Sequence, residues 1–262
     1  MTSAAEPEAA APASSTGRPA ALATPRARLG LIIPSSNRLS EPQFRHFAPP
    51  GLAVHVTRLR MTGPWHRPLG EIHDAIRAAA GALADARCDA IVFHCTGGAM
   101  ADGPEEEARI LELIAEETGA TALSTGAAVV EALRALAVTS LVLVSPYVQA
   151  TNDAEAAYLS RLGFRVVGDV ALGLKGGNDY ITVEPARWLA VALGAMREGA
   201  DGLFLSCTNT TQIEIIAEAE RRTGKPCVSS NQAVLWAAAR RLAPRLGGMP
   251  RIAGLGRLFG NA

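Results

Sequence analysis

Two cysteines occupy matching positions in the two halves of the chain. Residues 89–97 are predicted to form a buried strand that ends in Cys95 and a turn, and residues 201–209 repeat this pattern around Cys207. The two cysteines lie 112 positions apart (207 − 95). A thiolate and a neutral thiol facing each other could attack or deprotonate a planar carbon centre from one side and protonate it from the other. We therefore expect chemistry on a small molecule held between the two sulfur atoms.

Other landmarks of the sequence share this spacing. Pro34 matches Pro146, and Gly51 matches Gly163, each at an offset of 112 (146 − 34 and 163 − 51). Such internal similarity predicts a duplicated α/β unit, in which the ends of equivalent strands are brought together by a rough twofold axis. Each half then supplies one thiol to a shared cleft.

The four cysteines are not expected to behave alike. Cys88 and Cys227 are interpreted as small buried hydrophobic residues. Cys95 and Cys207 follow strands at the position where open α/β sheets bind ligands, which favours a functional interpretation. A disulfide between these two is the alternative, and it would need an oxidising compartment that nothing else in the sequence indicates.

Apolar periodicity predicts strands and helices in alternation from residue 28 onward, with a glycine-containing loop at 172–182. The predicted strands are residues 28–34, 53–59, 90–95, 121–124, 140–145, 165–170, 202–207 and 227–229, and the predicted helices are 72–87, 102–118 (with Asp102 as its cap), 127–135, 153–162, 185–198, 212–222 and 233–242. This alternation predicts an α/β fold of two pseudo-symmetric Rossmann-like lobes, each a parallel sheet flanked by helices, with the site in the cleft between them. The lobes are predicted as residues 28–135 and 136–262, with the C-terminal helix packing back between them.

Residues 1–27 are rich in alanine and proline and almost lack large apolar side chains. They cannot bury enough surface to offset their ordering entropy, so we expect a disordered tail. A targeting peptide is the alternative, but Glu6 and Glu8 are acidic where transit peptides are poor in acids.

The charge of the chain excludes some classes of partner. Its 262 residues include 25 basic and 25 acidic side chains, a formal net charge of zero, so no overall field attracts nucleic acid or an anionic membrane. No apolar run approaches the roughly 20 residues needed to span a bilayer. We expect a cytoplasmic protein.

The residues after each cysteine could hold an anion. Backbone N–H groups of Thr96 and Gly97, and of Thr208 and Asn209, lie in turns predicted to lead into helices, where the helix dipole favours negative charge. Small carboxylates are the natural ligands of such groups.

Four further side chains lie at equivalent strand ends or in the predicted loop. Ser36 and Asn37 follow the first strand, Tyr147 follows its counterpart, and Asn178 lies in segment 172–182. Amide and hydroxyl groups donate to a carboxylate without adding a full charge. The alternatives are a turn role for each asparagine and a packing role for Tyr147.

Other chemistries find little support in the sequence. His94 neighbours Cys95, but successive strand residues point to opposite faces, so it is interpreted as structural. The histidines and cysteines show no metal-binding spacing, and the glycine-rich motifs of nucleotide sites are absent. We predict no metal and no cofactor.

These motifs together resemble the aspartate/glutamate racemase superfamily, and within it the group of maleate cis-trans isomerases and arylmalonate decarboxylases. The resemblance covers nearly everything from residue 28 onward and rests on segments 34–37 with Glu41, 57–61, 95–96, 145–147, 206–209, 224–232 and Trp236. For a maleate isomerase it implies Cys95 as the nucleophile, Cys207 as the acid, and Asn37, Tyr147 and Asn178 as holders of the substrate carboxylates. It also implies a homodimer.

Departures from the group leave alternatives open. The resemblance implies bulkier apolar residues after the first cysteine in maleate isomerases, where this chain has Thr96 and two glycines, and glycine in place of that cysteine in arylmalonate decarboxylases. Two retained thiols argue against simple decarboxylation. Cis-trans isomerisation of a small dicarboxylate is the first hypothesis, racemisation or epimerisation of an α-substituted acid is the second, and a carboxylate-binding protein without turnover is the third.

Overall fold

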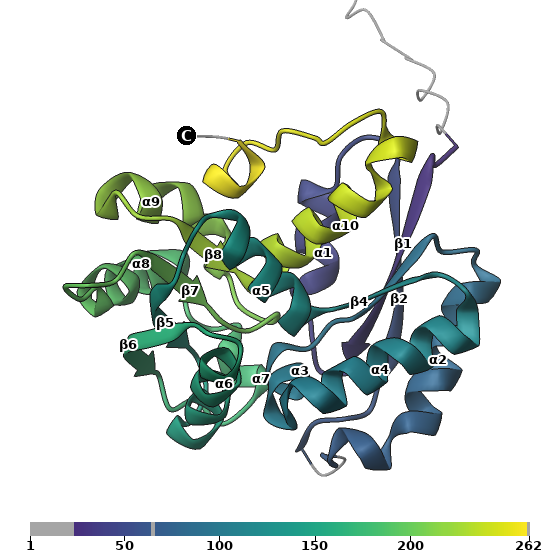
Figure 1. Ribbon diagram of the computed structural model, residues 1–262, viewed down its shortest axis with the longest axis horizontal. Helices are drawn as coiled ribbons and strands as arrows, with labels where there is room; N and C mark the ends of the chain where they lie inside the picture. Colours follow the sequence, from purple (N-terminus) through teal and green to yellow (C-terminus); the bar gives the residue numbers. More distant parts are fainter. Residues whose placement is uncertain (1–23, 64–65, 261–262) are drawn as a thin grey trace, which may run out of the picture.

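The computed structural model describes residues 24–63 and 66–260, and within them the chain forms two four-stranded parallel sheets flanked by helices (Figure 1). Strand order is β2-β1-β3-β4 in the first sheet and β6-β5-β7-β8 in the second, so the two halves share one topology. The predicted fold class is therefore confirmed. Residues 1–23 of the predicted tail lie outside the described residues.

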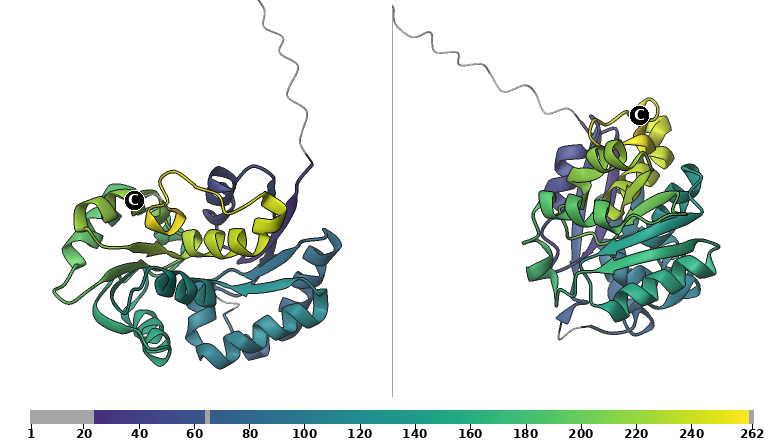
Figure 2. Two further views of the ribbon diagram at one scale, coloured as in Figure 1. Left: turned by 45° about the horizontal axis from the view of Figure 1, so that its top comes forward. Right: turned by 90° about the vertical axis from the view of Figure 1, so that its left-hand side faces the viewer.

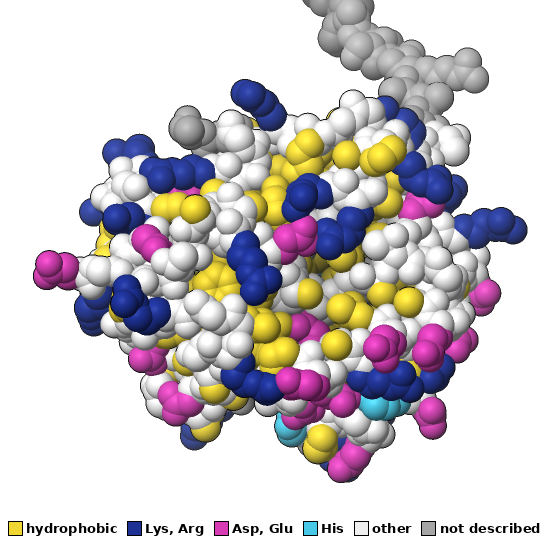
Figure 3. All heavy atoms as spheres, in the orientation of Figure 1, with side chains coloured by type: hydrophobic (Ala, Val, Ile, Leu, Met, Phe, Trp, Pro, Cys, Tyr) yellow, Lys and Arg dark blue, Asp and Glu magenta, His cyan; other side chains and the backbone are white. Residues whose placement is uncertain are grey.

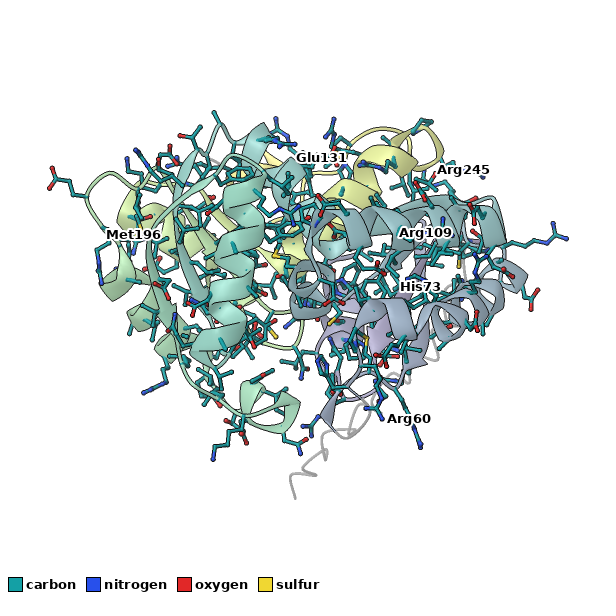
Figure 4. All side chains as sticks on the ribbon, turned by 60° about the horizontal axis from the view of Figure 1, so that its bottom comes forward. Arg60, His73, Arg109, Glu131, Met196 and Arg245 are labelled. Atoms are coloured by element: carbon teal, nitrogen blue, oxygen red, sulfur yellow. The ribbon has the colours of Figure 1, made fainter. Side chains whose placement is uncertain are left out.

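The first half alternates strands with helices. It contains β1 (Ala27–Pro34), α1 (Ser40–Phe47), β2 (Leu52–Leu59), the 3-10 helix η2 (Leu69–Glu71), α2 (His73–Asp85), β3 (Ala90–Phe93), α3 (Thr96–Ala101), α4 (Gly103–Thr118), β4 (Thr121–Ser124) and α5 (Thr125–Ala135). Helices α2 and α4 cover one face of the first sheet; His73 and Arg109, labelled on them in Figure 4, mark this side of the molecule.

The second half repeats this plan. It contains β5 (Ser140–Ser145), α6 (Gln149–Arg161), β6 (Arg165–Ala171), α7 (Gly177–Tyr180), α8 (Pro185–Ala195), β7 (Gly202–Leu205), η3 (Gln212–Ile215), α9 (Ile216–Thr223), β8 (Cys227–Ser229), α10 (Ser230–Leu246) and η4 (Arg257–Phe259). The offset of 112 is present in the strand register itself. Leu29 pairs with Ala90 in the first sheet, and Leu141 pairs with Gly202 in the second.

Helices α5 and α10 form the layer that joins the halves (Figure 2). Leu29, Leu31 and Ile33 of β1 belong to the same apolar cluster as these helices, whereas Ile32 faces the cluster made with α2 and α4. Burial on both faces explains why β1 is a continuous apolar run. Glu131 of α5 adds ion pairs to two arginines of α10.

Several element boundaries differ from those predicted. Both central strands end before the cysteines, at Phe93 and Leu205, which leaves each thiol in the turn that follows. Asp102 occupies the predicted N-cap position of α4, but its carboxylate makes no capping hydrogen bond and accepts one from the Leu69 N–H at 2.7 Å instead. Helices α1, α3 and α7 are not predicted from the sequence, because each has eight residues or fewer, too few for apolar periodicity to identify a helix.

Both signs of charge are present on the face in Figure 3, with basic side chains more frequent over its upper half and acidic ones more frequent at its lower right. Across residues 24–63 and 66–260, no helix combines the length and apolar character needed to cross a membrane.

Helix α10 begins three residues earlier than predicted because Ser229 and Gln232 form a capping box. We expect Ser229→Ala to lower the free energy of unfolding by about 1 kcal/mol, the usual cost of losing such a cap. Urea unfolding followed by circular dichroism measures this. Ser160→Ala, which removes an exposed hydroxyl bonded within α6, is the matched control and is expected to change stability by less than about 0.5 kcal/mol. Equal effects of the two substitutions would contradict the capping role.

Candidate active site

Every site residue predicted from the sequence lies on the wall of one cleft. Its volume is about 960 Å³, near the upper end of the range for small-molecule sites. Its walls include Ser36, Asn37, Cys95, Thr96, Gly97, Tyr147, Asn178, Cys207, Thr208 and Asn209. The fold therefore places both cysteines on one cleft, while the individual binding roles stay predictions.

One hydroxyl connects the turns that carry the two cysteines. Ser230, the first residue of α10, accepts a hydrogen bond from the Thr96 hydroxyl at 2.8 Å and from the Cys207 backbone N–H at 3.2 Å. Ser230 is fully buried, so these bonds are shielded from water. Ser230 was not among the site residues predicted from the sequence. The capping pattern of Ser229 and Gln232 could have revealed a helix start at this position.

Cys95 is the N-terminal cap of α3. Its sulfur accepts a hydrogen bond from the Gly98 N–H at 3.4 Å, and its side chain is partly exposed in the cleft. Burial raises the pKa of this thiol to about 11, against a smaller lowering by the Gly98 N–H. Cys95 is therefore a neutral thiol at neutral pH unless a bound molecule or a conformational change favours the thiolate.

Cys207 differs from Cys95 in having a strained backbone conformation and a more deeply buried side chain. Its backbone has a φ of 106°, a left-handed conformation that is rare for a residue with a side chain and costs on the order of 1–3 kcal/mol. The sulfur accepts a hydrogen bond from the Asn209 N–H at 3.3 Å, and only 6% of the residue is exposed. Burial raises its pKa to about 12, although the nearby Tyr147 hydroxyl acts in the opposite direction.

The two thiols therefore differ. Cys95 is more accessible and has the lower pKa, and a charge on either sulfur opposes ionisation of the other. Because a charge on Cys95 raises the pKa of Cys207, the two thiols do not ionise together, and the ionised pair consists of one thiolate and one neutral thiol. This is the combination of nucleophile and acid that an addition to a double bond needs.

The two glycines after Cys95 leave different amounts of space for a side chain. A Cβ at Gly98 would lie 2.9 Å from the Met61 methyl group and 3.2 Å from the Cys95 sulfur, so a side chain there would require the end of the Met61 side chain to move. A Cβ at Gly97 would meet the Tyr147 hydroxyl at an ordinary 3.7 Å. Gly97 thus lies directly across from Tyr147 on the wall of the cleft, with room between them for no more than a methyl group.

Asn37 is already engaged within the protein. Its amide nitrogen donates to the Ser40 hydroxyl at 2.9 Å and to Thr208 at 3.1 Å, and its oxygen accepts from the Ser40 N–H at 3.0 Å. The side chain is 1% exposed. Asn37 thereby ties the end of β1 to the turn after β7, and it would have to exchange one of these bonds to hold a substrate carboxylate.

Segment 172–182 contacts the first half. Asn209 accepts from the Arg38 N–H at 2.9 Å and donates to the Gly177 carbonyl at 3.1 Å. Asn178 on α7 accepts from the Arg38 guanidinium at 2.7 Å. Segment 172–182, which was predicted as a loop, therefore covers one side of the cleft. Its hydrogen bond with the Arg38 side chain links it to the first half.

His94 is structural, as the alternation of strand side chains predicted. It is fully buried, and its Nδ1 lies 3.1 Å from the Thr125 hydroxyl. Burial lowers its pKa to about 3, so the ring is neutral and does not assist Cys95. In the described part of the chain, no cluster of three or more His, Cys, Asp or Glu side chains could hold a metal ion.

Tyr180 is a cleft residue that was not predicted from the sequence. This residue of α7 lines the cleft, and its ring packs edge-on against Tyr147 with 5.6 Å between centroids. Apolar side chains complete the wall, among them Met61, Leu69, Ala101, Ala150 and Ala154. No motif marks these residues, because they meet only through the fold.

Two duplicated α/β lobes with one thiol from each define the class of the aspartate/glutamate racemase superfamily, as the sequence motifs predicted. The model of the arylmalonate decarboxylase family matches residues 29–259, and the chain therefore belongs to that family.

Individual relatives agree with this assignment. The maleate isomerase of Nocardia farcinica is 29% identical over 228 residues, covering 82% of this chain and 90% of the relative. The arylmalonate decarboxylase of Bordetella bronchiseptica is 34% identical over 146 residues, covering 55% of this chain and 60% of the relative. A mutant of the Nocardia farcinica maleate cis-trans isomerase with a covalently bound succinylcysteine intermediate superposes with a TM-score of 0.81 at 27% identity, covering 89% of this chain and 98% of the other.

The raised pKa of Cys95 predicts how its reactivity depends on pH. Only the thiolate is alkylated, so the rate of reaction with iodoacetamide should rise with pH by up to about tenfold per unit between about pH 7 and pH 10. Peptide mass spectrometry resolves the rate at each cysteine. Cys227, which is 1% exposed, is the internal control and should stay unlabelled in the folded protein. A Cys95 rate that is already constant above about pH 7 would contradict the raised pKa.

Proposed function

We propose that the protein is a cofactor-independent cis-trans isomerase of a small dicarboxylate, with maleate to fumarate as the simplest reaction. The observation that carries the proposal is the meeting of two unequal thiols, Cys95 and Cys207, on one cleft. At the level of class, the maleate isomerases among the relatives confirm the prediction of an isomerase. The particular substrate and the role of each residue are part of the proposal.

The two cysteines carry out complementary steps. The Cys95 thiolate forms a bond to one alkene carbon, while the π electron pair moves to the other carbon, whose carboxylate stabilises it. Cys207 gives its proton to that second carbon and becomes a thiolate. After rotation about the new single bond, the Cys207 thiolate removes a proton from the same carbon, the alkene re-forms, and Cys95 leaves as a thiolate.

Neutral donors are suited to hold the two carboxylates. The first-turn N–H groups of Thr96 and Gly97 have no partner within α3. Burial, followed by the nearby thiols and Glu155, holds the pKa of Tyr147 well above its usual range, so its hydroxyl stays protonated and can donate. Asn178 can offer its amide nitrogen while its oxygen remains bonded to Arg38.

Proton NMR of maleate incubated with the protein tests the proposal. We expect fumarate with the wild type, no detectable turnover with Cys95→Ala, and a loss of about 10²–10⁴-fold with Cys207→Ala, which removes the acid. Cys88→Ala, which changes a buried thiol outside the cleft, is the matched control and should retain turnover. Turnover that survives both cleft substitutions would refute the two-cysteine mechanism.

Racemisation of an α-substituted acid is the second candidate, because thiols from opposite halves can also act as base and acid on the two faces of one carbon. The same incubation in deuterated water separates the two reactions. A racemase introduces deuterium at the α-carbon of a chiral acid, whereas an isomerase changes the geometry of an alkene. Deuterium in a chiral acid, without any change in maleate, would favour the second candidate.

A further inference from the structure

Glu155 is a buried acid next to the cleft that the proposed reaction does not use. It lies on α6, which packs against α3, the helix capped by Cys95. The residue is 0% exposed, and neither carboxylate oxygen has a hydrogen-bond partner among the described residues. The Ser206 hydroxyl lies beside it, without good hydrogen-bond geometry, and Ser206 directly precedes Cys207. Glu155 therefore lies close to the turns of both cysteines.

The first half of the chain carries a neutral amide at the position equivalent to Glu155. Gln43 on α1 is the counterpart of Glu155 at the offset of 112 (155 − 43). Its amide is fully engaged: the nitrogen donates to the Thr210 carbonyl at 2.8 Å, and the oxygen accepts from Asn231. A neutral amide thus fits the equivalent place between the halves. The acid in the second half is not needed to fill space, and its lack of partners contrasts with the paired amide.

The charge state of Glu155 affects the whole cleft. A buried carboxylate without donors is costly, and this burial raises the pKa of Glu155 to about 8. The titratable groups that face it are Cys95 after β3, Cys207 after β7, Tyr147 before α6 and Tyr180 on α7, and a charge on Glu155 raises the pKa of each. The same repulsion acts on any anionic ligand in the cleft.

We propose that Glu155 is a positioning residue whose ionisation lowers the reactivity of the two cysteines. As a carboxylic acid it adds no charge beside α3 and the turn after β7, and as a carboxylate it opposes thiolate formation at both cysteines. The inference rests on the proposed function in taking both thiols as the reacting groups, and it goes further by naming the buried group that limits how much their reactivity gains from a rise in pH. By reciprocity, thiolate formation or binding of an anion keeps Glu155 protonated.

Site-resolved alkylation by iodoacetamide tests this in the wild type and in Glu155→Gln. At about pH 6.5 both proteins should react alike at Cys95, because Glu155 is neutral in the wild type. At about pH 9.5 Glu155→Gln should react roughly tenfold faster, which corresponds to a thiol pKa lowered by about one unit. The ratio of turnover at these two pH values should rise in the same variant.

Glu107 offers a matched control. It is a buried acid at the same junction, but it accepts hydrogen bonds from the Tyr158 hydroxyl and from the Ala127 N–H at 3.1 Å. Glu107→Gln should leave the pH dependence of Cys95 alkylation unchanged. Identical profiles for the wild type and Glu155→Gln, or an equal shift in Glu107→Gln, would overturn the inference.

Carbon-13 NMR of the Glu155 carboxyl is a second measurement. It uses only the wild-type protein, so its result is independent of whether the variants fold. Titration near the raised pKa of about 8 supports the inference, and titration below about 5 overturns it. Neither the alkylation rate nor the NMR titration requires turnover of a substrate. If maleate is not isomerised while the alkylation shift is present, the proposed substrate is wrong and the inference on Glu155 stands.

Discussion

The structure depends on a buried hydroxyl that two halves of the chain share. Ser230 accepts one hydrogen bond from the turn of Cys95 and another from the backbone of Cys207. Asn37 reinforces the junction by bonding across to Thr208. Because these bonds are buried, a change in the relative position of the halves would leave polar groups unpaired, which costs about 1–3 kcal/mol for each group. The distance between the thiol-bearing turns is thus fixed by the same contacts that join the lobes.

Burial sets the chemistry of this junction. The largest influence on each cleft thiol is desolvation, which disfavours the thiolate, and backbone N–H groups offset it only in part. A cleft of this kind keeps its reactive groups neutral until a substrate is bound and oriented by neutral donors. Burial also disfavours the charged form of Glu155, the additional carboxyl group that we propose to influence both sulfurs.

Much of the fold could be predicted from the sequence, because its strands are buried on both faces and read as continuous apolar runs that repeat at a fixed offset. The cleft residues followed from that repeat, since equivalent strand ends meet at one edge. The engagement of the Asn37 amide, the link through Ser230 and the proximity of Glu155 to both cysteines could not be predicted. Each depends on contacts between residues far apart in sequence, for which a single sequence carries no signal. Helix α3 was missed because Gly97 and Gly98 have low helix propensity.

Cys95 and Cys207 are proposed to act on one molecule in one cleft, and a bifunctional alkylating reagent shows whether one molecule can reach both sulfur atoms. The two linkers are 1,3-dibromoacetone and the longer 1,4-dibromo-2,3-butanedione, and the readout is peptide mass spectrometry. We expect at least one linker to join Cys95 to Cys207 within a single chain, and each single cysteine-to-alanine variant to carry only a one-ended adduct. If both cysteines react but neither reagent ever links them, the two thiols do not share a substrate and the proposed two-cysteine mechanism is wrong.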